Sequence, residues 1–470
     1  MPDNKCRWEL FYYNNHFDCN ETALPNDPHS YCILHSKKDD KDLDLFIEKV
    51  TERIKKCTKR IDLTECYFPK DFPSDYFQYI TFDDNKDGYI EFRDDFTPLF
   101  DKPVYFINAK FSQCADFSGA TFSQGACFRG ATFSQANFSG ATFSQEAYFS
   151  GATFSQEANF TEAKFLQEAD FTHVKFAQEA DFRLAKFSQY VTFFVAEFSS
   201  EVYFFGTTFE KGVNFSWAEF KDRAYFMPVG VPVEPESKKV TFDSLSLFKY
   251  VHFSGDVIFQ QVNLSKCSFL HSNIDKVDFR YCEFEKKRFR KNVLMDELDC
   301  DIAVKSATDK RKAREEYEHV RRLYLELKRN FEEKKDWNKA GDFHFGEMEC
   351  RRKMKGWLGR KLSLTAFYCW ASGYCERPLR TFLILLASVF IFFPLMYGLS
   401  EGKFISTLTI VNEYSVRLLD SLNVATLIRL GKPTETITGF WKPIVAVTEL
   451  IVVPILIALL ALALRRKVKR

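Results

Sequence analysis

The sequence predicts a solenoid of short repeats, followed by a helical segment and two membrane-spanning helices. Three observations lead to this fold class. A phenylalanine returns every five or six residues between Val104 and Phe226. Apolar residues between Tyr317 and Leu327 recur at helical spacing. Two later stretches are long and apolar enough to cross a bilayer. A chain of 470 residues has room for several such domains.

The phenylalanine repeat decides the predicted fold of the central part of the chain. Each phenylalanine follows a small residue by two positions, and the steps alternate between five and six: Ala141-Thr-Phe143, Ala147-Tyr-Phe149, Ala152-Thr-Phe154, Ala158-Asn-Phe160, Ala163-Lys-Phe165 and Ala169-Asp-Phe171. Neither the period of an α-helix nor the two-residue alternation of a strand fits these steps. A fixed short repeat is typical of a solenoid, in which each unit buries the apolar face of the next.

This pattern resembles the pentapeptide-repeat family, whose unit holds a small, a polar, a large apolar and two further polar residues. The resemblance implies an all-β right-handed quadrilateral β-helix, with the small and large apolar side chains inside. The unit here is mostly a double step, one step of five followed by one of six, and a four-sided coil would consist of two double steps. Plain steps of five also follow one another, as before and after Phe133, so the coil length should drift. We expect about 8 coils, a rod of roughly 40 Å, and phenylalanine stacked on phenylalanine in its bore.

Two further features of the repeat leave alternatives open. The separation of Phe226 and Phe242 equals the sum of three steps, so the stretch 227–240 either continues the coil or bulges out of it without changing register. The wall of the rod is polar, with 9 basic and 13 acidic residues between Val104 and Phe226. An excess of four acidic residues is too small to imitate DNA, so we expect no nucleic-acid partner. A protein partner on the faces of the β-helix remains the alternative.

Composition favours a reducing compartment and a membrane location. Thirteen cysteines without an N-terminal signal peptide argue against a disulfide framework. Residues 381–399 carry no charge, and residues 444–464 carry only Glu449. Basic residues flank both stretches on their outer sides, so the positive-inside rule places both chain ends in the cytoplasm of a two-span cell-membrane protein. The basic residues are Arg351, Arg352, Lys353, Lys355, Arg360, Lys361, Arg377 and Arg380 before the first stretch, and Arg465, Arg466, Lys467, Lys469 and Arg470 after the second.

The C-terminal part resembles the potassium-channel pore hairpin that is often fused to pentapeptide repeats. Local matches carry this resemblance: the juxtamembrane Gly373-Tyr-Cys-Glu-Arg-Pro378, a pore helix over 414–425, a filter position at 426–431, and Glu449 in the second span. The segment before the first apolar stretch resembles the helical connector of such fused channel proteins. It has Tyr317, Leu323, Tyr324 and Leu327 at helical spacing, followed by residues 340–349. The resemblance implies an ion path surrounded by an oligomer, most simply a tetramer.

The pore-like residues depart from a potassium filter. Such a filter needs glycines so that backbone carbonyls face the ion, and here they read Thr426, Leu427, Ile428, Arg429, Leu430 and Gly431. An arginine at that depth would repel potassium. Two hypotheses follow: a non-selective or anion-conducting pore, or a membrane-anchored protein-interaction scaffold without conduction. Glu449 is then either a carboxylate at headgroup level or a partner of Arg429 or of a neighbouring subunit's pore helix.

Two N-terminal motifs contain metal-ligand residues. Cys6, Cys19, Cys32 and His35 form a Cys3His set that ends in a close Cys-x2-His pair, which predicts structural zinc. Three structural cysteines are the alternative, and His16 and His29 are substitute ligands. The stretch 83–94 matches a calcium loop through Asp83, Asn85, Asp87, Tyr89 and Asp94. A clean entering helix is missing, so a turn ahead of the rod is the competing interpretation.

The remaining segments complete the predicted organisation. Residues 39–60 predict an amphipathic helix that caps the rod. Residues 351–365 predict an interfacial helix attracted to anionic lipid. No arrangement of nucleophile, base or phosphate loop suggests an enzyme. The predicted parts are a zinc module (1–38), a helical cap and lead-in (39–103), the phenylalanine-rich β-helix (104–290), a cytosolic connector (291–380) and a pore-like hairpin (381–470).

Overall fold

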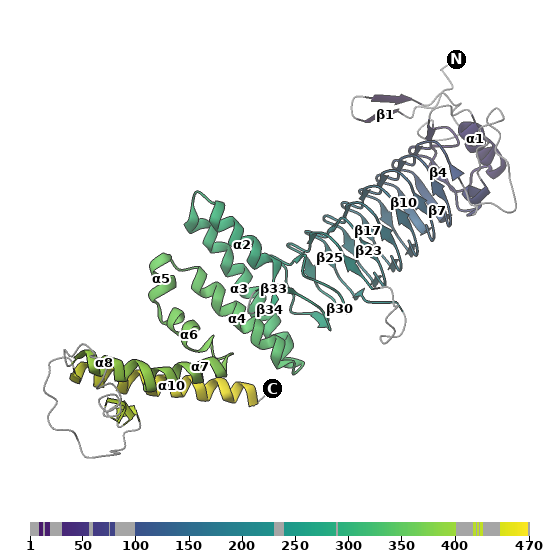
Figure 1. Cartoon of the computed structure of the whole chain (residues 1–470). Helices are drawn as coiled ribbons and strands as arrows, with labels where there is room; N and C mark the ends of the chain where they lie inside the picture. Colours follow the sequence, from purple (N-terminus) through teal and green to yellow (C-terminus); the bar gives the residue numbers. More distant parts are fainter. Residues whose placement is uncertain are drawn as a thin grey trace. The chain divides into compact units, whose positions relative to one another are not determined.

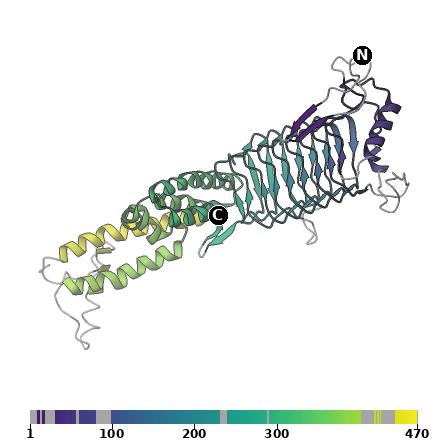
Figure 2. The ribbon, with the colours of Figure 1, turned by 90° about the horizontal axis from the view of Figure 1, so that it is seen from above.

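Short parallel strands stack into a β-solenoid in the N-terminal part of the chain (Figures 1 and 2). The computed structural model describes residues 9–12, 15–18, 31–55, 60–74, 76–79, 99–229, 239–287, 290–400, 417–419, 421–422, 424–425 and 442–468. It divides into two compact units, Met1–Leu298 and Asp299–Arg470, and each is described by itself.

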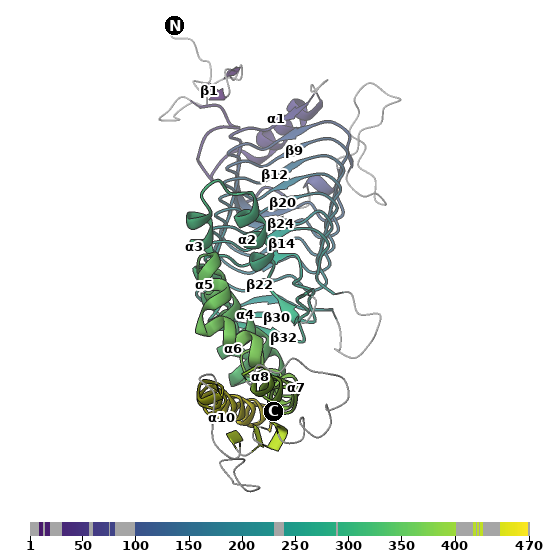
Figure 3. The same cartoon turned by 60° about the vertical axis from the view of Figure 1, so that its left-hand side comes forward.

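Strands with equivalent positions in successive coils pair in parallel and form the sides of the solenoid. One side is a column of strands, some of which are stacked in Figure 3: β3 (Ile61–Asp62), β6 (Val104–Tyr105), β9 (Ala126–Cys127), β12 (Ala147–Tyr148), β16 (Ala169–Asp170), β20 (Val191–Thr192), β24 (Val213–Asn214), β28 (Ser246–Leu247) and β31 (Cys267–Ser268). Another column consists of β5 (Leu99–Phe100), β8 (Thr121–Phe122), β11 (Thr142–Phe143), β15 (Lys164–Phe165), β19 (Lys186–Phe187), β23 (Thr208–Phe209) and β27 (Thr241–Phe242).

The other two sides share one sheet, because β7 (Lys110–Asp116) and β10 (Thr132–Asn137) each run across both. One of these columns contains β4 (Tyr67–Phe68), β13 (Thr153–Phe154), β17 (Lys175–Phe176), β21 (Glu197–Phe198), β25 (Glu219–Phe220) and β29 (His252–Phe253). The other contains β14 (Ala158–Asn159), β18 (Ala180–Asp181), β22 (Val202–Tyr203), β26 (Ala224–Phe226), β30 (Val257–Gln260) and β32 (Val277–Arg280). Within the described residues the solenoid is therefore four-sided.

The strand register gives the coil length. Thr153 pairs with Lys175, so one coil is two double steps long, as the repeat predicts. The coil is shorter by one position where Phe133 pairs with Phe154, and by two where Val257 pairs with Val277. Across the stretch 227–240, Phe209 pairs with Phe242, which is three double steps later instead of two. The ladder therefore resumes in register one double step later than usual, and most of the intervening stretch, residues 230–238, lies outside the described residues.

Phenylalanine rings fill the bore of the rod. Phe149 is fully buried, and its ring lies parallel to that of Phe171 in the next coil, with centroids 4.9 Å apart. Within its own coil the Phe149 ring also meets the Phe160 ring edge-on, with centroids 5.6 Å apart. Alanine, valine and a few other small residues fill the remaining inward positions, because the large rings leave no room for larger side chains. Offset-stacked and edge-on pairs of aromatic rings are both electrostatically favourable. Phenylalanine can therefore occupy the large inward position on all four sides.

Both ends of the stack of coils are covered by other elements. At the start, α1 (Leu43–Lys55) buries Phe46 edge-on against Phe68 and Phe72, with centroids 5.7 and 5.6 Å away. The parallel ladder begins here at Ile61, ahead of the first regular repeat at Val104. The short helix η1 (Tyr76–Tyr79) follows, and the strands β1 (Glu9–Tyr12) and β2 (Asn15–Asp18) pair antiparallel before this region.

At the other end, a hairpin of β33 (Glu285–Lys287) and β34 (Arg290–Val293) leads into α2 (Met295–Ser306). Asp296 accepts hydrogen bonds from the Ser268 hydroxyl at 2.5 Å and from the backbone N–H of Phe269 at 3.0 Å. The first turn of α2 thus satisfies polar groups at the last coils. Solenoids need such capping, because an open edge would expose unpaired backbone groups.

The second unit is helical. The helices α3 (Lys310–Glu333) and α4 (Trp337–Lys353) pack side by side, and α3 buries Tyr317, Leu323, Tyr324 and Leu327, the residues whose spacing predicted it. Asp309 caps α3 by accepting from the backbone N–H groups of Arg311 and Lys312. Then follow α5 (Trp357–Leu362), α6 (Leu364–Ser372), α7 (Pro378–Ala387), the π-helical turn η2 (Ser388–Phe392), α8 (Phe393–Ser400) and α10 (Lys442–Val468).

Candidate functional site

Two helical stretches of the second unit are long and apolar enough to span a membrane. They are Pro378–Tyr397, which runs through α7, η2 and α8, and Ile444–Arg465 within α10. Such helices are weak evidence for a membrane by themselves, because buried helices of soluble proteins can have the same composition. The two pack against each other (Figure 1), and their contact buries Val389, Phe393, Tyr397, Val445 and Val453.

A buried carboxyl group lies inside this apolar contact. Glu449 of α10 has no exposed surface. The Tyr397 hydroxyl of α8 donates a hydrogen bond to its Oε2 at 3.0 Å. Its Oε1 lies 2.5 Å from the hydroxyl of Ser421, which belongs to the described helical residues between the two apolar helices. Glu449 therefore connects three segments of the chain that lie far apart in sequence.

The Ser421 hydroxyl lies within hydrogen-bond distance of two oxygen atoms that could accept its hydrogen. Ser421 Oγ also lies 3.0 Å from the backbone carbonyl oxygen of Val389, which can only accept. A hydroxyl has one hydrogen, so it cannot donate both to this carbonyl and to a carboxylate. Both contacts would be satisfied if Glu449 were neutral and donated to Ser421, while Ser421 donated to Val389.

The π-helical turn explains why the carbonyl of Val389 is available. In an α-helix this carbonyl would accept from the N–H of Phe393, four residues later. In η2 that N–H donates to the carbonyl of Ser388 instead. π-helical turns of this kind are frequent at functional sites. The turn redirects a backbone acceptor towards Ser421, and the segment between the two apolar helices is thereby anchored to the first of them.

The juxtamembrane motif forms the turn between α6 and α7. Gly373, Tyr374 and Cys375 all have positive φ, and Pro378 begins α7. Tyr374 is buried and donates to Glu349 Oε2 at 3.3 Å, while its ring meets Phe345 edge-on. Burial, together with the nearby Glu349 carboxylate, raises the pKa of Tyr374 well above its ordinary value. Cys375 Sγ lies 3.7 Å from the carbonyl of Leu459 in α10, so this turn contacts both apolar helices.

The described residues include only part of the predicted pore segment. Residues 417–419, 421–422 and 424–425 of the predicted pore helix are helical, and Leu422 and Ala425 pack against the apolar contact. The filter-like residues 426–431, Arg429 among them, lie outside the described residues. Glu449 thus pairs with Ser421 and Tyr397 of its own chain, a pairing that the sequence analysis did not predict. The hydroxyl of Ser421 could have suggested a buried polar contact. Its partner Glu449, however, is 28 residues away, too far for a local pattern to reveal the pair.

Half of the predicted zinc set is described. Cys32 and His35 are both buried, and Cys32 Sγ lies 3.2 Å from His35 Nδ1 across a tight turn. Two ligands of one tetrahedral zinc ion, with bonds of about 2.3 Å to sulfur and 2.0 Å to nitrogen, would lie roughly 3.5 Å apart. The pair therefore fits a shared ion. Cys6, Cys19, the side chain of His16, His29 and the calcium-loop residues Asp83, Asn85, Asp87, Tyr89 and Asp94 lie outside what the structure describes.

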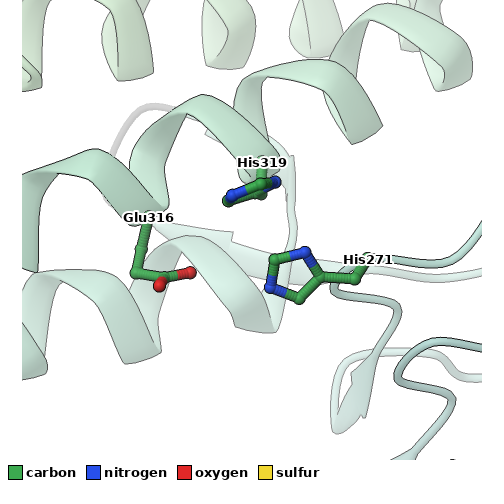
Figure 4. Close-up of side chains that lie close together, drawn as sticks. All are labelled: His271, Glu316 and His319. Atoms are coloured by element: carbon green, nitrogen blue, oxygen red, sulfur yellow. The ribbon is translucent and has the colours of Figure 1, made fainter.

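Two further ionisable side chains share a face of the helix α3. Glu316 and His319 lie one turn apart and project from the same side (Figure 4). His271, also labelled there, belongs to the rod, where its ring stacks on Tyr250 with centroids 4.5 Å apart. Two side chains on one helix are too few to hold a structural metal ion, so α3 alone supports no metal site.

A match to a family model supports the fold of the rod. A family model described as pentapeptide repeats (9 copies) matches residues 106–153 and 149–197. No curated protein matches the chain. A solved structure of full-length QnrB1, a plasmid-mediated fluoroquinolone resistance protein, is 20% identical over 39% of this chain and 85% of that chain, with a TM-score of 0.14.

Proposed function

Since this chain carries a pentapeptide-repeat β-solenoid ahead of two apolar helices, we propose that it is an oligomeric membrane protein whose hairpin forms a pore that is not potassium-selective. One observation carries the proposal. The segment around Ser421 bonds to both apolar helices, through Val389 on the first and Glu449 on the second. A short helix held between two spans is the layout of a re-entrant pore element. Such elements exist at membrane depth only where protein or a water-filled cavity surrounds them.

The oligomer follows from the number of helices. Two spans cannot surround a path, so several copies must contribute, and a tetramer is the simplest closed arrangement. The rod offers no path of its own, because phenylalanine rings fill its bore. Arg429 would then lie near the constriction of each copy, where its charge favours anions over potassium. Both chain ends lie in the cytoplasm, according to the basic residues outside the spans.

A second candidate function is a membrane-anchored interaction scaffold, and an exposed aromatic stack on the rod favours it. Trp217 is 55% exposed and stacks on Tyr250 in the next coil, with centroids 4.5 Å apart. Both residues stand at a corner of the coil with positive φ, a strained conformation for large side chains. Exposed tryptophan and tyrosine are enriched in protein–protein contacts, so a protein partner on this face would make the hairpin an anchor only.

Planar-bilayer recording of the purified protein under a KCl gradient distinguishes the two candidates. We expect unitary current steps that reverse near the chloride equilibrium potential, because Arg429 repels cations. Arg429→Glu should move the reversal potential towards that of potassium, and Arg417→Glu, the same charge change on a described helical residue, should move it much less. If correctly inserted protein passes no current at any voltage, the pore hypothesis is rejected and the scaffold hypothesis remains.

We also propose that zinc holds the N-terminal segment through Cys6, Cys19, Cys32 and His35. The support is the buried Cys32–His35 pair, whose separation suits a shared ion. The purified protein should contain one zinc per chain by elemental mass spectrometry, and chelation should expose residues 1–40 to protease. Cys32→Ser should lose the metal, whereas Cys66→Ser, at another buried cysteine, should keep it. Unchanged protection after chelation would contradict the proposal.

A further inference from the structure

The segment between α4 and α7 exposes large apolar side chains within a few residues of one another. Trp357 is 69% exposed, Leu362 78% and Leu364 88%, and Leu358 between them is also exposed. Single exposed apolar residues are normal, but several large ones close together in sequence are typical of an interaction site. These four residues, together with Arg360 and Lys361, are called the α5 surface below.

Basic residues dominate this part of the chain. From Arg351 to Arg380 the sequence holds eight basic residues and one acidic residue, Glu376. Two of the basic side chains are paired inside the unit, since Arg352 binds Glu349 and Lys353 binds Asp301. Lys361 instead lies over the ring of Trp357, with Nζ 5.0 Å from the centroid. The α5 surface therefore combines apolar side chains with local positive charge.

The neighbouring contacts hold α5 in place with this surface outward. Arg352 of α4 donates to the carbonyl of Arg360 at 3.1 Å. Lys355 donates to Thr365 Oγ1 of α6 at 3.1 Å. The first bond fixes α5 to α4, and the second joins the turn before α5 to α6. The exposed apolar side chains then continue through Leu379 and Phe382 into α7, the first apolar helix.

We propose that the α5 surface lies in the headgroup layer of a bilayer that contains anionic lipid. Tryptophan prefers the membrane interface, leucine inserts its side chain below it, and arginine and lysine bind anionic headgroups. A second copy of the chain fits less well. A two-fold contact centred on this surface would bring Arg360 and Lys361 close to the same basic residues of the second copy. The inference rests on the proposed membrane insertion, because α7 must enter the same bilayer.

Hydrogen exchange of the full-length protein in nanodiscs tests this inference. We expect the peptide around residues 354–366 to exchange several-fold more slowly in phosphatidylcholine with phosphatidylglycerol than in phosphatidylcholine alone. Arg360→Gln with Lys361→Gln should remove most of this difference between the two lipids. Lys310→Gln with Lys312→Gln, the same charge change at the exposed start of α3, should leave it unchanged.

The other outcomes separate this inference from the proposed function. Equal exchange of this peptide in both lipid compositions, while α7 and α10 stay protected, would overturn the inference and leave the membrane insertion intact. Rapid exchange of α7 and α10 in nanodiscs would instead contradict the insertion itself. Protection of the α5 peptide in detergent that rises with protein concentration would assign the surface to a second copy and overturn the lipid proposal.

Discussion

Phe204→Ala should lower the stability of the middle of the rod by about 3–5 kcal/mol, the range typical of a buried phenylalanine reduced to alanine. Phe204 has no exposed surface and stacks between Phe182 and Phe226, with centroids 5.2 and 4.8 Å away. Its removal opens a cavity that rigid neighbouring coils cannot close. In a solenoid the loss acts on adjacent coils, so amide exchange between β18 and β26 should accelerate by about two to four orders of magnitude.

The neighbouring Phe205 provides a matched control. It is half-buried on the outside of the coil, where its ring centroid lies 5.4 Å from that of Tyr203 and 5.8 Å from that of Tyr225. Phe205→Ala removes the same number of atoms from the adjacent position, and we expect it to cost about 1 kcal/mol. Equal effects of the two substitutions would mean that the stacked bore does not stabilise the rod more than its surface does.

Glu449→Leu should destabilise the hairpin by about 1–3 kcal/mol, because it leaves the buried Tyr397 hydroxyl without its acceptor. Glu449→Gln should stay within about 1 kcal/mol of the original protein, since a glutamine can accept from Tyr397 through its carbonyl and donate to Ser421 through its amide, as a neutral carboxyl group does. Thermal unfolding of the full-length protein in detergent, followed by size-exclusion chromatography, measures both changes.

The comparison of the two variants tests the protonation state. If Glu449→Gln is as destabilising as Glu449→Leu, the carboxyl group is charged, and the donor–acceptor chain from Glu449 through Ser421 to Val389 is wrong. Ser421→Ala should be destabilising in either case, because it leaves the Val389 carbonyl without its donor. Ser388→Ala supplies a control at a neighbouring hydroxyl, which donates to the carbonyl of Leu385 one turn earlier in the same apolar stretch.

Some features could be predicted because they repeat at short range. The alternating steps of five and six gave the coil of two double steps, since inward positions recur in every unit and each coil only has to match its neighbours. The spacing of Tyr317, Leu323, Tyr324 and Leu327 gave α3 in the same way. The start of the ladder at Ile61 could not be found, because β3 and β4 precede the regular repeat and pair with β6 and β7 across a long stretch without its pattern.

The solenoid and α3 could be predicted because a periodic pattern of apolar residues specifies one buried face wherever it occurs. The two apolar helices could be predicted from their length and their lack of charge. The surroundings of Glu449 could not be predicted, because they form only when the helices pack. Its partners Ser421 and Tyr397 stand 28 and 52 residues away, and the carbonyl that completes the chain is released by a π-helical turn. Hydrogen bonds between single polar groups leave no periodic pattern, so they are defined only once the helices have packed and excluded water.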